Sequence, residues 1–78
     1  MKFNVKVRDP FSDIAKIRFA VQRKLADVVG LSETERRWIT DARTHRIWEC
    51  AASAGGLDEK TIEFDTGTGK ASIRARNN

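Results

Sequence analysis

Few residues in this chain belong to the types that usually perform catalysis. The 78 residues include one histidine, His45, and one cysteine, Cys50. Asp41 or Glu49 could orient His45 at helical spacing, but no serine or cysteine is placed to act as its nucleophile. Within one helix, Cys50 would point well away from His45. Because one cysteine and one histidine also cannot form the usual zinc site, we expect a protein that is not an enzyme and holds no metal or cofactor.

A glycine-rich segment that ends in a lysine, Thr66-Gly67-Thr68-Gly69-Lys70, has the composition of a phosphate-binding loop. It lacks the Walker spacing, and no helix is predicted after it to supply amide donors. The neighbouring carboxylates Glu33 and Glu35 are explained by their position at the start of a helix. The sequence therefore offers no set of catalytic residues.

The basic residues are distributed unevenly along the chain. Fifteen basic and eleven acidic residues give a net charge of +4. All eleven acidic residues lie between Asp9 and Asp65, where they outnumber nine basic ones. In the two ends of the chain, outside residues 9–65, every charged side chain is basic. These residues are Lys2, Lys6, Arg8, Lys70, Arg74 and Arg76. Such segments attract phosphate groups or acidic protein surfaces.

Length and composition indicate one folded domain over residues 1–78. A single cysteine cannot form an internal disulfide, which excludes a secreted disulfide scaffold and is typical of a reducing cytoplasm. No apolar run approaches the roughly 20 residues of a membrane span, and the first residues do not resemble a signal peptide. We expect a cytoplasmic protein without a membrane partner.

A strand and a helix are predicted at the start of the chain. Residues 2–8 alternate between apolar and polar, which is typical of a strand with one buried face. Asp9 as the cap and Pro10 as the first helical residue predict a helix from there to about Val29, closed by Gly30 in the left-handed conformation. Its apolar stripe consists of Ile14, Ile17, Val21, Leu25 and Val28.

A second helix is predicted from the capping box formed by Ser32 and Glu35. Two interpretations of its length remain open. The helix continues into Ala54 before Gly55, or it breaks near Thr44 and residues 46–51 form a strand. We favour the helix, because an alanine-rich segment that runs into glycine resembles a helix end. Its predicted inward side consists of Trp38, Ala42, His45 and Ala52 with Trp48 at the margin, and both tryptophans are expected in the core.

From Thr61 the pattern again alternates, which predicts a β-hairpin around Gly67-Thr68-Gly69. Two registers are compatible with it, one pairing Ile62 with Ile73 and the other pairing Phe64 with Ile73. We prefer the first, in which a type II′ turn places Gly67 first.

These elements predict a small α+β domain in the order strand, helix, helix, β-hairpin. Two helices would pack on one face of a three-stranded sheet, or a four-stranded one if residues 46–51 are extended. If the first strand lies beside the last, all six terminal cations meet on the open face of the sheet. The alternative is a solvated face on which Glu63 and Asp65 neutralise Arg74 and Lys70.

The first functional hypothesis is a regulatory or accessory protein that contacts the phosphates of DNA or RNA through this basic sheet face. No aromatic side chain is predicted there, which disfavours base stacking and leaves contact that depends on salt rather than on sequence. A variant of the hypothesis is a truncated winged helix with residues 67–70 as the wing. Its groove-reading helix would present Arg36, Arg37, Thr40, Arg43 and Thr44.

The second hypothesis is a protein-directed inhibitor or adaptor, of the kind that includes accessory and anti-defence proteins of phages. It would use the same cations against an acidic surface, or Phe19 against an apolar one. Phe19 lies opposite the apolar stripe of the first helix, so an exposed Phe19 would form a docking patch. We favour burial of Phe19 under the second helix. The nucleic-acid hypothesis leads narrowly, and no small-molecule substrate is evident.

Overall fold

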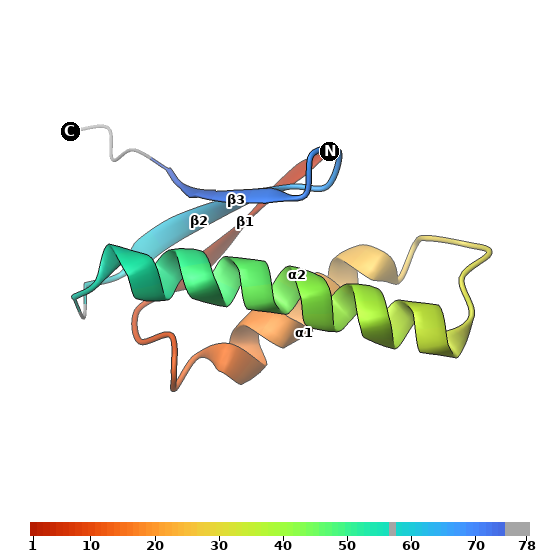
Figure 1. Cartoon of the computed structure of the whole chain (residues 1–78), viewed down its shortest axis with the longest axis horizontal. Coiled ribbons are helices and arrows are strands. Elements are labelled where there is room, and N and C mark those ends of the chain that lie inside the picture. The colour runs from red at the N-terminus through yellow and green to blue at the C-terminus, as the bar shows by residue number, and fades with distance from the viewer. Residues whose placement is uncertain (57, 75–78) are drawn as a thin grey trace.

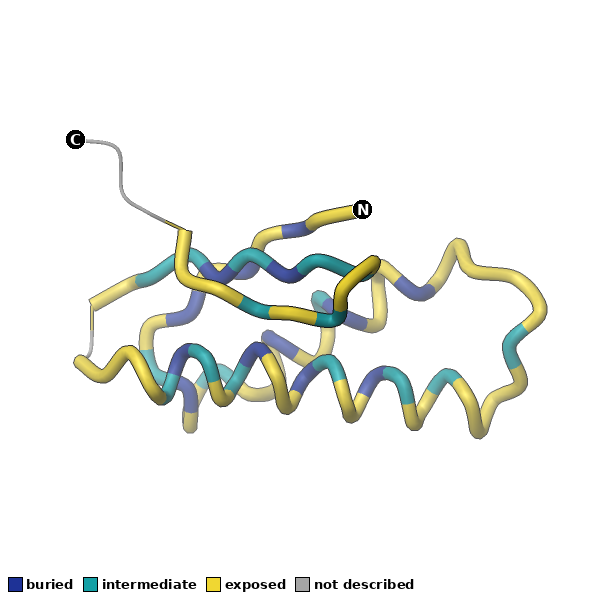
Figure 2. The backbone as a smooth tube through the Cα atoms, turned by 45° about the horizontal axis from the view of Figure 1, so that its top comes forward, coloured by how far each residue is buried: buried dark blue, intermediate teal, exposed yellow. Residues whose placement is uncertain are grey.

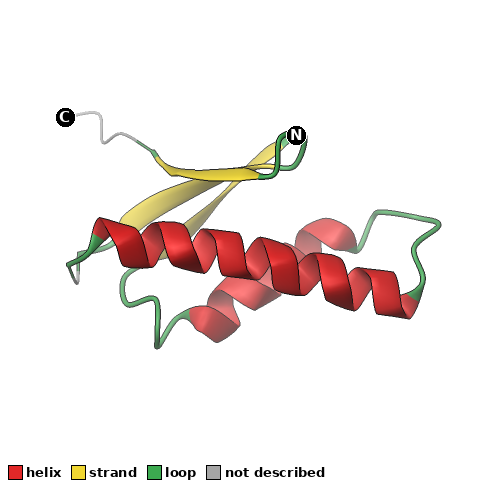
Figure 3. Ribbon diagram, viewed as in Figure 1, coloured by secondary structure: helices red, strands yellow, loops and turns green. Residues whose placement is uncertain are grey.

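The computed structural model describes residues 1–56 and 58–74. Two helices, α1 (Ile14–Leu25) and α2 (Glu33–Ala54), cover one face of a three-stranded antiparallel sheet (Figure 1). The strands are β1 (Lys2–Val7), β2 (Lys60–Asp65) and β3 (Lys70–Ile73). The elements follow the chain in the order β1, α1, α2, β2, β3, so the predicted α+β architecture is confirmed (Figure 3).

The sheet has the strand order β1-β2-β3, so the hairpin's first strand lies in the middle. The expectation that the first strand lies beside the last is therefore wrong. β1 pairs with β2, which places Phe3 opposite Phe64 with their ring centroids 5.6 Å apart. β2 supplies larger inward side chains than β3, whose inward positions include Ala71, so pairing with β2 buries more apolar surface.

The core lies between the sheet and the two helices, and buried positions alternate along β1 and β2 (Figure 2). α1 packs against β1, while α2 packs against β2, β3 and α1. Ten apolar residues are buried: Phe3, Val5, Val7, Ile17, Val21, Leu25, Ile47, Ala51, Ile62 and Phe64. Neither described helix has both the length and the apolar composition that crossing a membrane requires.

The start of α1 is one turn later than the sequence predicts. The Asp9 carboxylate accepts the N–H of Phe11, and its carbonyl accepts the N–H of Asp13, so Asp9 caps a preceding turn rather than the helix itself. Asp13 is the residue before the helix, and its carboxylate turns back to accept the N–H of Arg8 at 2.9 Å. This bond holds the pKa of Asp13 below its ordinary value.

The end of α1 is earlier than predicted, at Leu25 instead of Val29. The guanidinium of Arg36, on α2, donates to the carbonyls of Leu25 and Val28. These bonds satisfy carbonyls that a longer helix would otherwise have bonded internally. Gly30 does have a positive φ of 85°, but it lies in the connection to α2 and is not the helix cap.

α2 is one continuous helix, as favoured from the sequence; it ends at Ala54 and is capped by Gly55, which has a φ of 69°. Its capping box is confirmed by the reciprocal bonds between Ser32 and Glu35. The N–H of Ser32 bonded to Glu35 is the main reason that the pKa of this carboxyl is lowered. The helix start could be predicted because both partners are local in sequence.

The buried side of α2 was predicted wrongly. Trp38 is 77% exposed, and the residues that face the core are instead Thr40, Thr44, Ile47 and Ala51. Small and β-branched side chains let this long helix lie close to the sheet and to α1. Trp48 is half-buried at the side of the helix, where its ring meets Phe11 edge-on at 5.5 Å.

Thr44 buries a hydroxyl that has no hydrogen-bond partner among the described residues. An unsatisfied buried polar group costs about 1–3 kcal/mol, so Thr44→Val, which keeps the shape, is expected to raise the free energy of unfolding by about 1 kcal/mol. Urea denaturation followed by circular dichroism measures this change. Thr34→Val, at an exposed position of α2, is the control and should change stability by less than about 0.5 kcal/mol. An equal change in both variants would contradict the assignment.

The β2–β3 hairpin has the preferred register, with Ile62 opposite Ile73. Its turn differs from the predicted type II′ turn, because the glycine with positive φ is Gly69, at 72°, and not Gly67. The N–H of Gly69 donates to the Asp65 carbonyl at 2.8 Å. The Asp65 carboxylate accepts the N–H of Gly67 at 2.8 Å as well, which favours this wider loop over a two-residue turn.

Candidate functional site

The open face of the sheet, which points away from the helices, carries three short rows of side chains. The register gives the rows Lys2, Asp65, Lys70; Asn4, Glu63, Ser72; and Lys6, Thr61, Arg74. Cations occupy only the two edge strands or the residue just after β3. The central strand contributes two carboxylates and a threonine, so the cations are divided rather than gathered.

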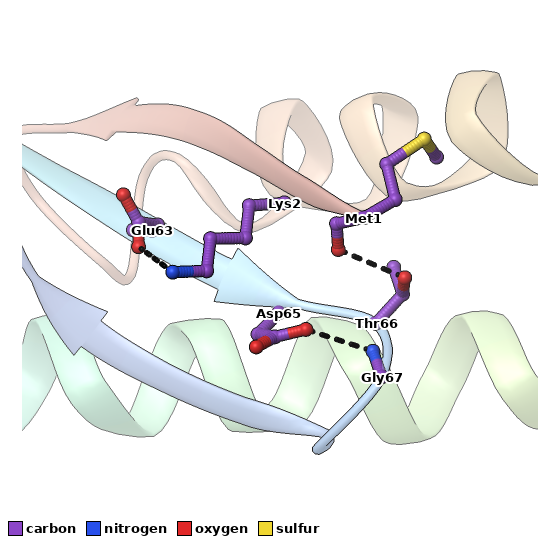
Figure 4. A network of polar contacts seen from close by, with 6 residues as sticks. All are labelled: Met1, Lys2, Glu63, Asp65, Thr66 and Gly67. Carbon is purple, nitrogen blue, oxygen red and sulfur yellow. Dashed lines mark hydrogen bonds and ion pairs between the residues drawn. The ribbon is translucent and has the colours of Figure 1, made fainter.

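The two carboxylates between the edges have partners in the structure (Figure 4). Glu63 forms an ion pair with Lys2 at 3.7 Å. Asp65 accepts the Gly67 N–H, which is the largest cause of its lowered pKa, and it stays ionised at neutral pH. The predicted crowding of six cations on this face is therefore wrong. The alternative, a partly neutralised face, describes it better, although Glu63 pairs with Lys2 and not with Arg74, and no ion pair between described residues joins Asp65 to Lys70.

The remaining predicted binding residues have different environments. Arg8 is exposed just beyond β1, and Arg76 lies outside the described residues. Arg36 is engaged with the carbonyls at the end of α1, and the Arg43 guanidinium lies over the Phe64 ring, 5.8 Å from its centroid. Only Arg37, of the three helix arginines proposed, is exposed.

The orientation of α2 weakens the predicted groove-reading role. Thr40 and Thr44, which would have faced the bases, are buried against the core. Two of the five contacts predicted for the winged-helix variant are therefore lost, because reading base edges requires side chains that project from the protein surface.

A broad hollow of the surface is lined by residues of β1, by the exposed side of α1, and by residues at the start of β2 and the end of β3. We call it the basic depression, because the cations that line it are Lys6, Lys16, Arg23, Lys24, Lys60 and Arg74. Its acidic lining residues are Asp27 and Glu59. No ion pair between described residues involves Lys6, Lys16 or Lys24. The positive charge of the depression is thus available to a partner.

Four of these cations, Lys16, Arg23, Lys24 and Lys60, were missed as site residues by the sequence analysis. The spacing of Lys16, Arg23 and Lys24, seven and eight residues, places these three on one side of α1, which was a usable signal. Linking them to Lys6 required knowing that α1 packs against β1 and that β1 is an edge strand. That information is tertiary, so the spacing alone could not have revealed the depression.

Phe19 lies within the basic depression and is 60% exposed. The expectation that α2 covers it is therefore wrong. The guanidinium of Arg23 lies 6.0 Å from the centre of its ring, which is the range of a cation–π contact. Aromatic side chains, including phenylalanine, and arginine are among the residue types enriched in protein interfaces.

A second, smaller hollow of about 250 Å³ lies between α2 and the β2–β3 turn. Its lining includes the exposed ring of Trp38, together with Ile39, Phe64 and the guanidinium groups of Arg43 and Arg46. It is separate from the basic depression. Trp38 is therefore a suitable control for variants of Phe19.

The groups that could perform catalysis do not converge. His45 pairs with Glu49 at 3.2 Å on an exposed part of α2, and its ring stacks on Trp48. Burial raises the pKa of the Cys50 thiol, so the nucleophilic thiolate is scarce at neutral pH. Residues 1–56 and 58–74 contain no cluster of three histidine, cysteine or carboxylate groups that could hold a metal ion.

Comparison of the chain with protein-family models, with curated proteins and with solved structures gives no match. A functional conclusion therefore depends on the charges and shapes of the surface itself.

Proposed function

We propose that this chain is a non-enzymatic binding protein of the inhibitor or adaptor type, which docks its basic depression onto an acidic surface of another protein. The observation that supports this proposal is a single hollow lined by six cations, against two carboxylates, together with the exposed ring of Phe19. Charge complementarity steers such a partner, and the apolar ring supplies contact area once it arrives.

The open face of the sheet is a poor path for a nucleic acid. A phosphate backbone that crossed the open face of the sheet would pass over the carboxylates of Glu63 and Asp65, which repel it. The described open face also offers no aromatic ring for base stacking. A protein partner that binds in the basic depression can place its acidic side chains over the cations and its apolar side chains over Phe19, without crossing Glu63 and Asp65.

Nucleic acid is the competing partner, and the net charge of +4 is the feature that favours it. Its contact would follow the phosphates and would weaken steeply with salt for every sequence. A direct comparison of two labelled probes, a short poly-glutamate peptide and a mixed-sequence DNA duplex, distinguishes the partners. Fluorescence anisotropy over a range of salt concentrations measures both affinities.

We expect the peptide to bind more tightly than the duplex at low salt. The double variant Lys16→Glu/Lys24→Glu should weaken peptide binding about tenfold, which corresponds to roughly 1.4 kcal/mol. Arg37→Glu/Arg46→Glu makes the same change in net charge on exposed positions of α2 and should leave the affinity within about threefold of the original.

Each other outcome has a definite meaning. Tighter binding of the duplex would replace the proposed function with the nucleic-acid one. Equal losses in both double variants would show that net charge, and not the depression, governs binding. Absence of binding by both probes at low salt would overturn both functions. Phe19→Ala, with Trp38→Ala as its control, tests whether the aromatic ring adds to the contact.

A further inference from the structure

The outer edge of β1 presents unpaired backbone groups to the basic depression. Met1 accepts the N–H of Thr66 at 2.8 Å, so this pair is a hydrogen-bonded one. Bonded and non-bonded pairs alternate along an antiparallel ladder, which makes Phe3/Phe64 and Val5/Ile62 the next bonded pairs. The N–H and C=O groups of Lys2, Asn4 and Lys6 therefore point away from β2.

No described residue covers this edge. None of the hydrogen bonds among the described residues involves the main-chain N–H of Lys2, Asn4 or Lys6, and all three residues are exposed. The register of β1 is continuous over its six residues, without a bulge or a proline that would prevent another strand from pairing. Asn4 and Lys6 line the basic depression, so this edge opens directly into it.

We propose that β1 accepts an extended acidic segment of the partner protein as a fourth strand of the sheet. This inference deepens the proposed function, on which it rests, by naming the form in which the acidic partner binds. Strand addition would satisfy the outward backbone groups of β1, and these main-chain bonds would supply affinity while side chains supply specificity.

The surroundings of the edge define the side-chain pattern of the added strand. Its residues that face the open side of the sheet lie beside Lys2 and Lys6, which favours aspartate or glutamate at alternate positions. Its residues that face the helices lie over Phe19 and Ala20 of α1, which favours apolar side chains there. The partner segment is therefore one that alternates acidic with apolar residues.

A second copy of this chain is a poor occupant of the same edge. Antiparallel pairing of two β1 strands centred on Asn4 would place Lys2 of each strand opposite Lys6 of the other. Like charges directly opposite each other destabilise a strand pair. The lysines thus discourage self-association while they attract an acidic strand.

Asn4→Pro tests this inference without changing the charge of the depression. Proline removes only the outward N–H at this position, so the ladder to β2 stays complete. The probe is a labelled peptide that alternates glutamate with valine, and its affinity is measured by fluorescence anisotropy. Ala71→Pro is the matched control, because the N–H of Ala71 points outward at the opposite edge, on β3.

We expect Asn4→Pro to weaken peptide binding at least about tenfold and Ala71→Pro to leave it within about twofold. Amide hydrogen exchange of the unmodified chain should also slow at Lys2, Asn4 and Lys6 when the peptide is bound. Unchanged exchange at these amides, or unchanged binding by Asn4→Pro, would overturn strand addition. If Asn4→Pro does not fold, as judged by circular dichroism, the exchange measurement on the unmodified chain decides.

The inference and the proposed function fail in different ways. If Lys16→Glu/Lys24→Glu loses binding while Asn4→Pro binds fully, the proposal of an acidic partner stands and only the proposal of strand addition is overturned. If the peptide does not bind the unmodified chain, both the strand addition and the proposed function are overturned.

Discussion

Replacing Ile47 by alanine is expected to lower the free energy of unfolding by about 2–5 kcal/mol. Ile47 lies at the centre of the buried side of α2 and has no exposed surface. Alanine would leave a cavity where the helix meets the core, and the surrounding side chains can fill it only in part. A domain of this size has a total stability of roughly 4–12 kcal/mol, so the loss is a large fraction of it.

Urea denaturation of Ile47→Ala, followed by circular dichroism, measures this loss. Trp38→Ala is the control on the same helix, since it removes a larger side chain that is 77% exposed. It should cost less than about 1 kcal/mol. A greater loss from Trp38→Ala than from Ile47→Ala would mean that α2 is rotated so that the tryptophan faces the core.

Val5→Pro is expected to destabilise the protein by about 3 kcal/mol or more, whereas Asn4→Pro, one residue earlier, should cost less than about 1 kcal/mol. The N–H of Val5 belongs to the bonded pair with Ile62, so proline leaves the Ile62 carbonyl without its donor in a buried part of the sheet. The N–H of Asn4 points outward, and its loss leaves no buried group unpaired.

Thermal and urea unfolding of the two proline variants, at equal pH and salt, measures the difference between their free energies of unfolding. Val5→Ala serves as the control that removes most of the side chain but keeps the amide donor. Similar stabilities of Val5→Pro and Asn4→Pro would show that the bonded and non-bonded pairs of β1 are assigned the wrong way round.

The elements that could be predicted from the sequence are those whose signals are local. The periodic Ile17, Val21 and Leu25 and the capping box at Ser32 depend on neighbours within one or two turns. The hairpin could likewise be predicted from alternation, and the preferred register is the observed one, although the type II′ turn that favoured it does not form. Both bounds of α1 were missed because they depend on side chains that bind backbone from outside the helix, namely Asp13 and Arg36.

The candidate site could be predicted only in part. Lys6 and Arg74 were predicted as binding residues from the sequence, whereas Phe19 was predicted as a docking residue only if it is exposed, and its burial was favoured; all three line one depression. The order of the strands could not be predicted, because β1 is polar on its outer face and could pair with either strand of the hairpin. The buried side of α2 was hidden for a related reason. Thr40 and Thr44 have polar side chains, so the two tryptophans seemed better candidates for the core.

The pairing of β1 with β2 joins segments from opposite ends of the chain, with Met1 bonded to Thr66. During synthesis, β1 leaves the ribosome long before residues 60–65 exist, so the sheet cannot close while the chain is still growing through α2. Contacts this distant in sequence slow folding, because the chain must first give up the entropy of a loop that spans both helices. Until that closure, both edges of β1 are unpaired, and Lys2 and Lys6 are the kind of residue that opposes edge-to-edge aggregation of such a strand.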